Sequence, residues 1–333
     1  MNRLAAAALF AIALGSIGAP GLMQSTGGAR PPASTNAPGA TKQEFERWMK
    51  ELTNWGRWGK DDQLGTANLF TAEKRKQALG LARLGTNVSL GHDVVDAKGS
   101  DGAAPFSLNM LFRDDRRLVR DRIDIDYHGG FFTHFDALCH VVYEGKIYNG
   151  LDFNSIVTDD GCSKMGITGL KDGVITRGVL IDLPRLKGVP YLAPGTRIYR
   201  QDIEAWEKQA GVKVGSGDVL LVRNGRWVRR AQLSSEGNVG FDASFLPFLK
   251  DRDVAILGSD TAHEVTDNIP GLNVTVVHKF SVVARGMNLL DNVDLDAVAE
   301  TAARLKRWEF MVVISPLRVP KGTGSPINPI AVF

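Results

Sequence analysis

The sequence predicts an α/β protein with one main domain, whose mixed, partly closed sheet has helices outside it. Two observations support this: segments with strand character alternate with segments of helical periodicity, and no internal repeat is visible. The chain of 333 residues is 44% hydrophobic, which allows a large buried core. No change in composition follows Thr41, so we assign residues 42–333 to a single domain.

The first 41 residues have a different composition. Asn2 and Arg3 precede an apolar run at 4–14, and small residues follow, as in a signal peptide. The run is too short for a permanent membrane span, and the Gly-, Pro- and Ser-rich stretch at 15–41 is expected to be a disordered linker. We expect an exported protein, periplasmic or extracellular, with no membrane association after processing. A disordered tail without a sorting role is the alternative.

Helical periodicity marks five segments. In the first, Phe45, Trp48 and Met49 share one face, and in the second Glu73 suits the first turn. The expected helices cover residues 42–52, 71–84, 201–209, 241–250 and 294–305.

Strands are expected where aliphatic and β-branched residues cluster or alternate with polar ones. Residues 122–127 alternate charged and apolar side chains, which predicts a half-buried strand. The strand at 254–257 ends in residues 258–264, at the carboxyl end where α/β proteins bind ligands. The expected strands cover residues 87–95, 122–127, 178–183, 218–223, 254–257, 273–277 and 309–316.

The most informative stretch is residues 133–140, THFDALCH, which contains the pattern H-x-D-x-x-x-H. On a strand His134 and Asp136 face the same side, and a helical turn after it would place Asp136 and His140 on one face. Imidazole and carboxylate ligands suit Zn²⁺, Mn²⁺ or Fe²⁺. Three of the six histidines fall within 128–140, so we predict a divalent-metal site with an open position. Ordinary core or surface histidines are the alternative.

The remaining candidates outside this stretch have weaker patterns. Cys139 and Cys162 could form a disulfide in an oxidising compartment, but we expect buried free thiols because Cys139 lies inside the metal segment. His92 is expected to be structural. The net charge of +3 is spread over both signs, so no nucleic-acid partner is predicted.

The metal segment resembles the signature H-x-G-T-H-x-D-x-P-x-H of the cyclase family of metal-dependent hydrolases, which includes bacterial kynurenine formamidase and isatin hydrolase. Thr133, His134, Asp136 and His140 match this signature. Further similar segments extend the likeness over residues 43–333: 55–68, 217–223, 258–261, 278, 286–292 and 322–329.

Three positions depart from the family pattern. Gly130 stands where the family has its first histidine, and His128 can replace that histidine if the chain bulges by two residues. Leu138 replaces a proline. Asp291 replaces a glutamate and is one methylene shorter, which favours one metal ion over two.

The resemblance implies the swivelling β/β/α fold and a site built around Mn²⁺ or Zn²⁺. His134 and Asp136, with His128, would be metal ligands, and His140 would be a further ligand or an acid/base group. His278 matches a histidine beside the metal. Asp291 would orient a histidine or bind the metal; a cap or turn role is the alternative.

Substrate contacts are expected from aromatic residues and from one loop histidine. Trp55, Trp58 and Phe132 are candidate walls for a planar ring, although aromatic residues more often fill the core. His263, beside Glu264, lies on the strand-end loop, where an ordinary loop role is equally compatible.

The resemblance implies hydrolysis of an amide or cyclic amide C–N bond in a small, aromatic molecule, as in an arylformamidase. The alternatives are lactone hydrolysis, a cyclase or dehydratase step at the same metal, or an exported, inactive binding protein. Family members also suggest a homodimer or homotetramer, with a small-molecule substrate as the other partner.

Overall fold

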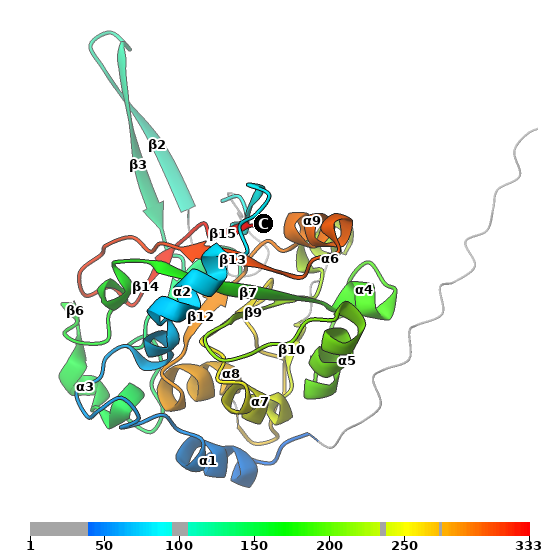
Figure 1. The fold of residues 1–333 in the computed structure, drawn as a ribbon. Helices are drawn as coiled ribbons and strands as arrows, with labels where there is room; N and C mark the ends of the chain where they lie inside the picture. The colour runs from blue at the N-terminus through cyan, green and yellow to red at the C-terminus, as the bar shows by residue number, and fades with distance from the viewer. Residues whose placement is uncertain (1–38, 95–105, 234–237, 273–274) are drawn as a thin grey trace, which may run out of the picture. The chain divides into compact units, whose positions relative to one another are not determined.

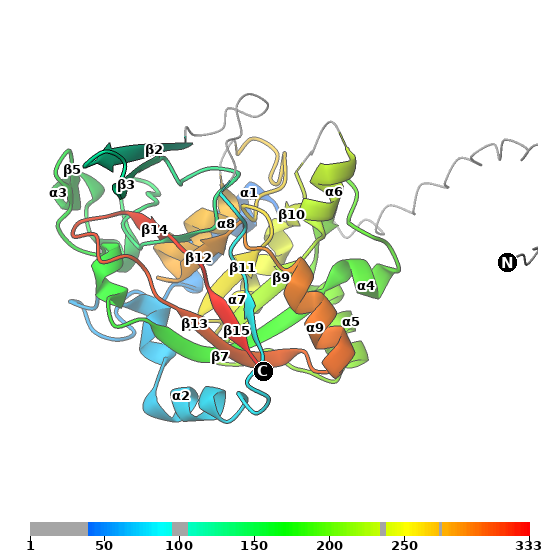
Figure 2. The same ribbon diagram turned by 90° about the horizontal axis from the view of Figure 1, so that it is seen from above.

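The computed structural model describes residues 39–94, 106–233, 238–272 and 275–333. Its main element is a nine-stranded sheet with the order β1-β15-β13-β7-β9-β11-β12-β4-β14. The sheet curls into a half-barrel flanked by helices (Figures 1 and 2). The predicted α/β class and the mixed, partly closed sheet are confirmed.

The centre of the sheet is parallel. β7 (Val174–Asp182), β9 (Val219–Arg223), β11 (Ile256–Ser259) and β12 (Asn288–Asp291) run in the same direction. Almost every residue in the last three of these strands is buried, because both faces of the sheet are covered. The carboxyl ends of these four strands therefore lie at the same end of the sheet.

Antiparallel strands complete the sheet on both sides. On one side lie β13 (Glu309–Ile314), β15 (Ile330–Val332) and β1 (Asn87–Ser89). On the other side, β4 (His134–Asp136) pairs with both β12 and β14 (Gly324–Pro326). The strand that contains the histidine motif is thus held by hydrogen bonds on both of its edges.

Three of the five expected helices form close to the predicted bounds: α1 (Lys42–Glu51), α5 (Arg200–Ala210) and α9 (Asp296–Leu305). The helix expected at 71–84 also forms, but α2 (Ala72–Leu79) ends five residues earlier than predicted. α1 begins with a capping box, in which Thr41 and Glu44 satisfy each other's backbone N–H groups. The fifth is shorter than expected, because β10 (Gly240–Phe241) and a 3₁₀ turn precede α7 (Leu246–Asp251).

The other helices are short. They are α3 (Phe153–Ile156), α4 (Leu183–Lys187), α6 (Arg226–Gln232) and α8 (Val276–His278). Among the described residues, no helix is long and apolar enough to cross a bilayer.

Three strand predictions need correction. Residues 275–277 are not a strand: Val276–His278 is helical and continues into the π-helical segment Lys279–Ala284, while residues 273 and 274 lie outside the described part of the chain. Of the strand expected at 87–95, only Asn87–Ser89 forms a strand among the residues that the structure describes.

The third correction concerns the half-buried strand expected at residues 122–127, before the metal motif. β3 (Leu118–Ile125) pairs only with β2 (Phe106–Arg113) and is exposed rather than half-buried. The alternation of charged and apolar residues therefore reflects the two faces of a separate ribbon.

Candidate metal centre

Five of the six histidines lie close to two aspartates beside the neighbouring strands β4 and β12. The cluster consists of His128, His134, His140, His263, His278, Asp136 and Asp291. His92 lies outside it: its ring stacks on Trp227 at 3.6 Å and its Nδ1 lies 3.1 Å from Asp294. This placement fits the structural role expected for His92.

β4 determines how the motif is presented. As expected for a strand, His134 and Asp136 face the same side, with His134 Nε2 3.5 Å from Asp136 Oδ1. His134 Nδ1 lies 2.8 Å from the Phe132 carbonyl oxygen, which fixes the ring and leaves Nε2 facing the cluster. A turn rather than a helix follows, and it brings His140 Nε2 to 4.0 Å from the same carboxylate oxygen.

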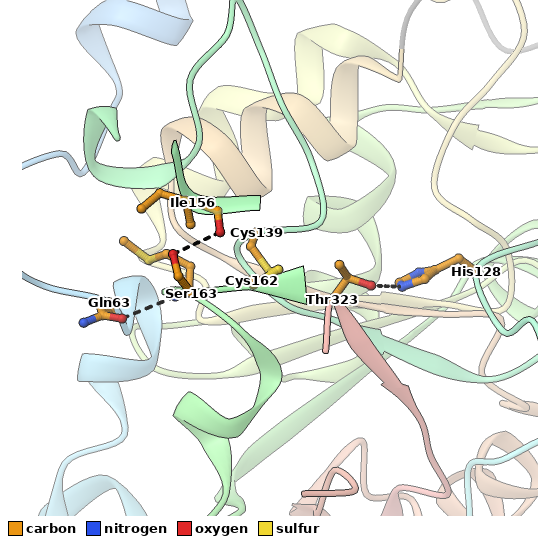
Figure 3. The surroundings of a disulfide bond; sticks show 8 residues. Gln63, His128, Cys139, Ile156, Cys162, Ser163 and Thr323 are labelled. Atoms are coloured by element: carbon orange, nitrogen blue, oxygen red, sulfur yellow. Dashed lines mark hydrogen bonds between the residues drawn. A yellow bond between two sulfur atoms is a disulfide. The ribbon is translucent and has the colours of Figure 1, made fainter. Parts of the chain in front are cut away.

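The structure brings His128 into the cluster, although it lies two positions before the family's first histidine. Its Nδ1 is 3.2 Å from Asp136 Oδ1, and its ring stacks on His140 at 3.9 Å. Its Nε2 lies 3.0 Å from Thr323 Oγ1, an interaction visible in Figure 3. The two-residue shift is therefore accommodated by the loop between β3 and β4.

Asp136 has the surroundings of a metal ligand. Both carboxylate oxygens are buried and, among the described residues, lie 3.2 to 4.0 Å from imidazole nitrogens without a well-aligned hydrogen bond, and His128 Nδ1 likewise lacks one. A buried carboxylate without hydrogen bonds is costly unless a cation compensates for it. Burial raises the pKa of Asp136, but the surrounding histidines outweigh burial and hold that pKa below its usual value. The donor set fits a divalent metal ion.

Two overlapping groups have ligand atoms within 4.8 Å of one another, and both include Asp136. They are His128, Asp136 and His140, in which the two histidines are partly exposed, and His134, Asp136 and Asp291, all three of which are buried. The structure therefore offers more ligands than a single metal ion needs.

Asp291 links the cluster to two further histidines. Its Oδ1 lies 2.8 Å from His263 Nε2, and its Oδ2 lies 3.3 Å from His278 Nε2. On the far side, His278 Nδ1 is 3.0 Å from Glu264 Oε1. The carboxylate of Asp291 thus faces imidazoles rather than capping a helix.

Two histidines of the cluster have pKa values that shift in opposite directions. Burial lowers the pKa of His140 to about 4, so this ring is neutral at pH 7. Burial also acts against protonation of His278, but Asp291 and Glu264 outweigh it and raise the pKa of His278 well above its usual value. Burial and His263 act in opposite directions on Asp291, and the net result is a pKa well below normal.

A cavity of about 440 Å³ opens beside the cluster, a size suited to a small molecule. Its lining includes His128, His134, His140, His278 and Asp291 from the cluster. It also includes a set of polar residues that we call the polar wall: Arg226, Arg229, Asn238, Thr261, Glu264 and Thr275.

None of the four expected substrate-contacting side chains lines this cavity. Trp55 donates its ring N–H to the Val283 carbonyl, and Trp58 lies under the guanidinium of Arg57. Phe132 is buried and lines a separate groove. His263 is fully buried behind Asp291.

One lining residue of the cavity, Arg226, was not singled out by the sequence, and its partner Asn292 was noted only as part of the segment 286–292. Arg226 donates from Nη1 to Asn292 Oδ1 at 2.6 Å, and Asn292 Nδ2 donates to the Gly129 carbonyl at 2.7 Å. Arg226 begins α6, whose first backbone N–H groups are bound by the buried carboxylate of Asp260. Asn292 directly follows Asp291, so it could have been found there; nothing in the local pattern marked Arg226.

The expectation of free thiols is wrong, because Cys139 and Cys162 form a disulfide (Figure 3). The chain returns through the short ribbon β5 (Val157–Thr158) and β6 (Gly161–Cys162), which places Cys162 beside the turn after β4. The bridge thereby joins the residue before His140 to a segment 23 positions later.

Comparison with known proteins decides the family. The family model described as "Putative cyclase" matches residues 48–264, which is more than half of the chain. The chain belongs to the cyclase family. A comparison with curated proteins gives no match.

Solved structures of similar proteins agree with this assignment. The crystal structure of a novel cyclase is 28% identical, with a TM-score of 0.78 over 86% of this chain and 99% of that one. Isatin hydrolase A from Labrenzia aggregata is 18% identical, with a TM-score of 0.55 over 79% of this chain and 100% of that one. Isatin hydrolase A from Ralstonia solanacearum is 18% identical, with a TM-score of 0.53 over 77% and 95%. The last two likenesses concern the fold alone.

Proposed function

We propose that this cyclase-family protein is a metal-dependent hydrolase of a small molecule that contains an amide or cyclic amide bond. The observation that carries the proposal is the buried Asp136, whose oxygens, without a well-aligned hydrogen bond among the described residues, face histidines on the wall of a cavity. Isatin hydrolases share the fold, which makes a cyclic amide the first substrate class to test.

Asp136, His128 and His134 would hold the divalent ion, because both imidazoles approach the same carboxylate oxygen at 3.2 and 3.5 Å. When bound, a divalent ion polarises a carbonyl group and lowers the pKa of water. His140 lines the cavity, and because burial lowers its pKa to about 4 its neutral ring is a weak base that would serve as a further ligand or as a transient proton acceptor. His278, held by Glu264, would donate a proton to the leaving nitrogen.

The polar wall would orient the substrate. Arg226 is nearly buried at the cavity and donates from Nη1 to Asn292 Oδ1, so it would bring a positive charge to a carbonyl or carboxylate oxygen of the substrate. A ring-opened product of a cyclic amide carries such a carboxylate. The polar wall therefore favours a substrate that is rich in oxygen acceptors.

The test is a panel of N-formyl aromatic amines, cyclic imides and lactones, assayed with the full chain loaded with Mn²⁺ or Zn²⁺. We expect turnover of at least one amide class, and a loss of at least a hundredfold in kcat/KM for His134→Ala. His92→Ala is the matched control, because this histidine lies outside the cluster, and it should keep wild-type rates.

The panel also separates the alternatives. Turnover of lactones alone would replace amide hydrolysis with ester chemistry at the same centre. If the metal-loaded chain turns over no member of the panel but binds their products, the binding-protein alternative would be favoured. Equal rates for His134→Ala and wild type would contradict the proposed ligand role.

We propose further that the protein acts outside the cytoplasm. The composition of residues 2–19 supports export, and a disulfide between Cys139 and Cys162 is typical of an oxidising compartment. Fractionation of cells that express the full chain tests this. We expect a shortened mature protein in the exported fraction, and recovery of the uncleaved chain in the cytoplasm would refute it.

A further inference from the structure

His128 enters the cluster from a loop rather than from a strand. β4 begins at His134, and His128 lies in the loop that joins β3 to β4. A side chain on a loop lacks the paired strand that holds His134 and Asp136 in place, so its orientation depends on the contacts of the ring itself. Those contacts come from neighbouring rings, from Asp136 and from Thr323.

Neighbouring rings hold the plane of the His128 imidazole. His140 stacks on it with ring centroids 3.9 Å apart and 6° between the planes. His134 meets it edge-on at 5.2 Å, and Tyr127 packs beside it at 4.5 Å. This packing does not decide which nitrogen faces the cluster, because a half-turn about the bond between Cβ and Cγ leaves the ring plane unchanged.

Two polar contacts select one of the two orientations. Nε2 of His128 lies 3.0 Å from Thr323 Oγ1 (Figure 3), and Nδ1 lies 3.2 Å from Asp136 Oδ1. After a half-turn of the ring, carbon atoms would occupy the positions of both nitrogens. The contact with Thr323 therefore keeps Nδ1, rather than a C–H group, toward the carboxylate.

Thr323 is fixed relative to the strand that carries Asp136. The Ala137 N–H donates to the Thr323 carbonyl at 2.9 Å, and the next residue, Gly324, pairs with Asp136 in the ladder between β14 and β4. These backbone contacts do not involve the Thr323 side chain. Its hydroxyl group can therefore be removed without removing a backbone hydrogen bond.

The lack of a side chain at Gly324 makes room for the ring. A Cβ atom at this position would lie 2.9 Å from His128 Cε1 and 2.7 Å from the Phe135 carbonyl oxygen, closer than real Cβ atoms come to other atoms. Phe135 belongs to β4, which is paired on both edges, so its carbonyl group cannot move aside. Thr323 and Gly324 together thus form a seat that fits the His128 ring.

The group behind each ligand ring determines which nitrogen carries the proton. A carbonyl oxygen only accepts, so His134 Nδ1 donates to the Phe132 carbonyl and Nε2 keeps a lone pair. A hydroxyl group both donates and accepts. If Thr323 donated to His128 Nε2, the proton of the neutral ring would be on Nδ1, which has no aligned hydrogen bond among the described residues. If Thr323 accepts, the lone pair of Nδ1 points toward Asp136 and toward a cation held there.

We propose that Thr323 is a positioning residue of the metal centre: its hydroxyl oxygen accepts a hydrogen bond from His128 Nε2 and leaves Nδ1 to bind the divalent ion. The two histidine ligands would then use opposite ring nitrogens, Nδ1 of His128 and Nε2 of His134. Thr323 does not line the cavity, so its hydroxyl group acts on the centre through His128. This inference rests on the proposed metal-dependent function.

The experiment changes the hydroxyl group and keeps the shape of the side chain. Thr323→Val removes the hydroxyl, and Thr323→Ser keeps it. Thr176→Val is the matched control, because Thr176 donates its hydroxyl to the Gly217 carbonyl on β7, which three strands separate from β4. Equilibrium dialysis of the full chain against Zn²⁺ gives the dissociation constant. We expect this constant to rise roughly ten- to a hundredfold for Thr323→Val and to keep the wild-type value for the other two variants.

A second measurement needs no variant. Proton–nitrogen NMR spectra of the Zn²⁺-loaded chain, with isotopically labelled histidine, show which ring nitrogen binds the ion. In the cluster, Nε2 of His134, His140, His263 and His278 faces a carboxylate, whereas His128 presents Nδ1. We therefore expect one ring with the ion on Nδ1 and the proton on Nε2, and this ring identifies His128.

Each other outcome overturns the inference. Equal Zn²⁺ affinity of Thr323→Val and wild type would show that the hydroxyl does not position a ligand. An equal loss in Thr323→Ser or Thr176→Val would show a general effect of substitution, and metal-bound rings that all use Nε2 would contradict the orientation of His128. These results leave the proposed function intact, whereas a wild type that retains no Zn²⁺ would refute both.

Discussion

Removing the disulfide should destabilise the protein and have a smaller effect on its metal centre. The bridge closes a loop across a separation of 23 residues, for which loop-closure entropy predicts a contribution of roughly 3 kcal/mol. We expect the double variant Cys139→Ser, Cys162→Ser to lose that amount of unfolding free energy. Its metal affinity should fall less than tenfold, because β4 remains paired with β12 and β14 on both edges.

The assay is urea unfolding at equilibrium, with and without a thiol-free reductant. A loss of roughly 3 kcal/mol corresponds to a midpoint shift on the order of 1 M urea. Reductant should move the wild type to the midpoint of the double variant and leave the variant unchanged, which serves as the control. The reasoning is refuted if the wild type and the double variant unfold at the same urea concentration without reductant.

Other predictions concern the site and the core. Treatment with EDTA should abolish turnover and added Mn²⁺ or Zn²⁺ should restore it; turnover that survives complete chelation would contradict the metal's role. Asn292→Ala should raise KM about tenfold with a smaller effect on kcat, since Arg226 loses its positioning partner, and an unchanged KM would count against that role. Phe245→Ala should cost about 3–5 kcal/mol in urea unfolding, because the ring is fully buried, and a loss below 1 kcal/mol would be inconsistent with that burial. In the protein without added metal, the contacts of protonated His278 stabilise the fold at neutral pH, and this stabilisation is lost as pH rises through the raised pKa of His278. The contacts of ionised Asp291 also stabilise the fold, and their stabilisation is lost as pH falls toward the lowered pKa of Asp291. Unfolding of His278→Gln across the pH range should show a weaker alkaline decline than wild type, and an identical profile would exclude the contribution of His278.

The sequence was most informative where local periodicity decides the structure. The two-residue spacing of His134 and Asp136 places both on one face of a strand, and that is where they lie. The strands at 218–223 and 254–257 were also found, because buried parallel strands are continuous apolar runs.

Local patterns failed where distant segments determine the outcome. The β-branched residues Val276 and Val277 indicate a strand, but they are buried at the start of a helical segment, where tertiary context overrides the local preference. Arg226 begins a helix whose first backbone N–H groups are bound by Asp260, the residue after β11, and this contact between distant segments leaves no local pattern in the sequence. The pairing of Cys139 with Cys162 depends on the return of the chain through β6, which no spacing rule specifies.

The central claim is that the imidazoles and the carboxylate around Asp136 bind a divalent cation. Equilibrium dialysis of the purified full chain against Mn²⁺ or Zn²⁺, followed by metal analysis, tests it directly. The wild type should retain at least one ion per chain, and Asp136→Asn should lose at least a hundredfold in affinity, because the shared anionic ligand is gone. A wild type that retains no ion, or an Asp136→Asn variant that binds as tightly as the wild type, would contradict the account.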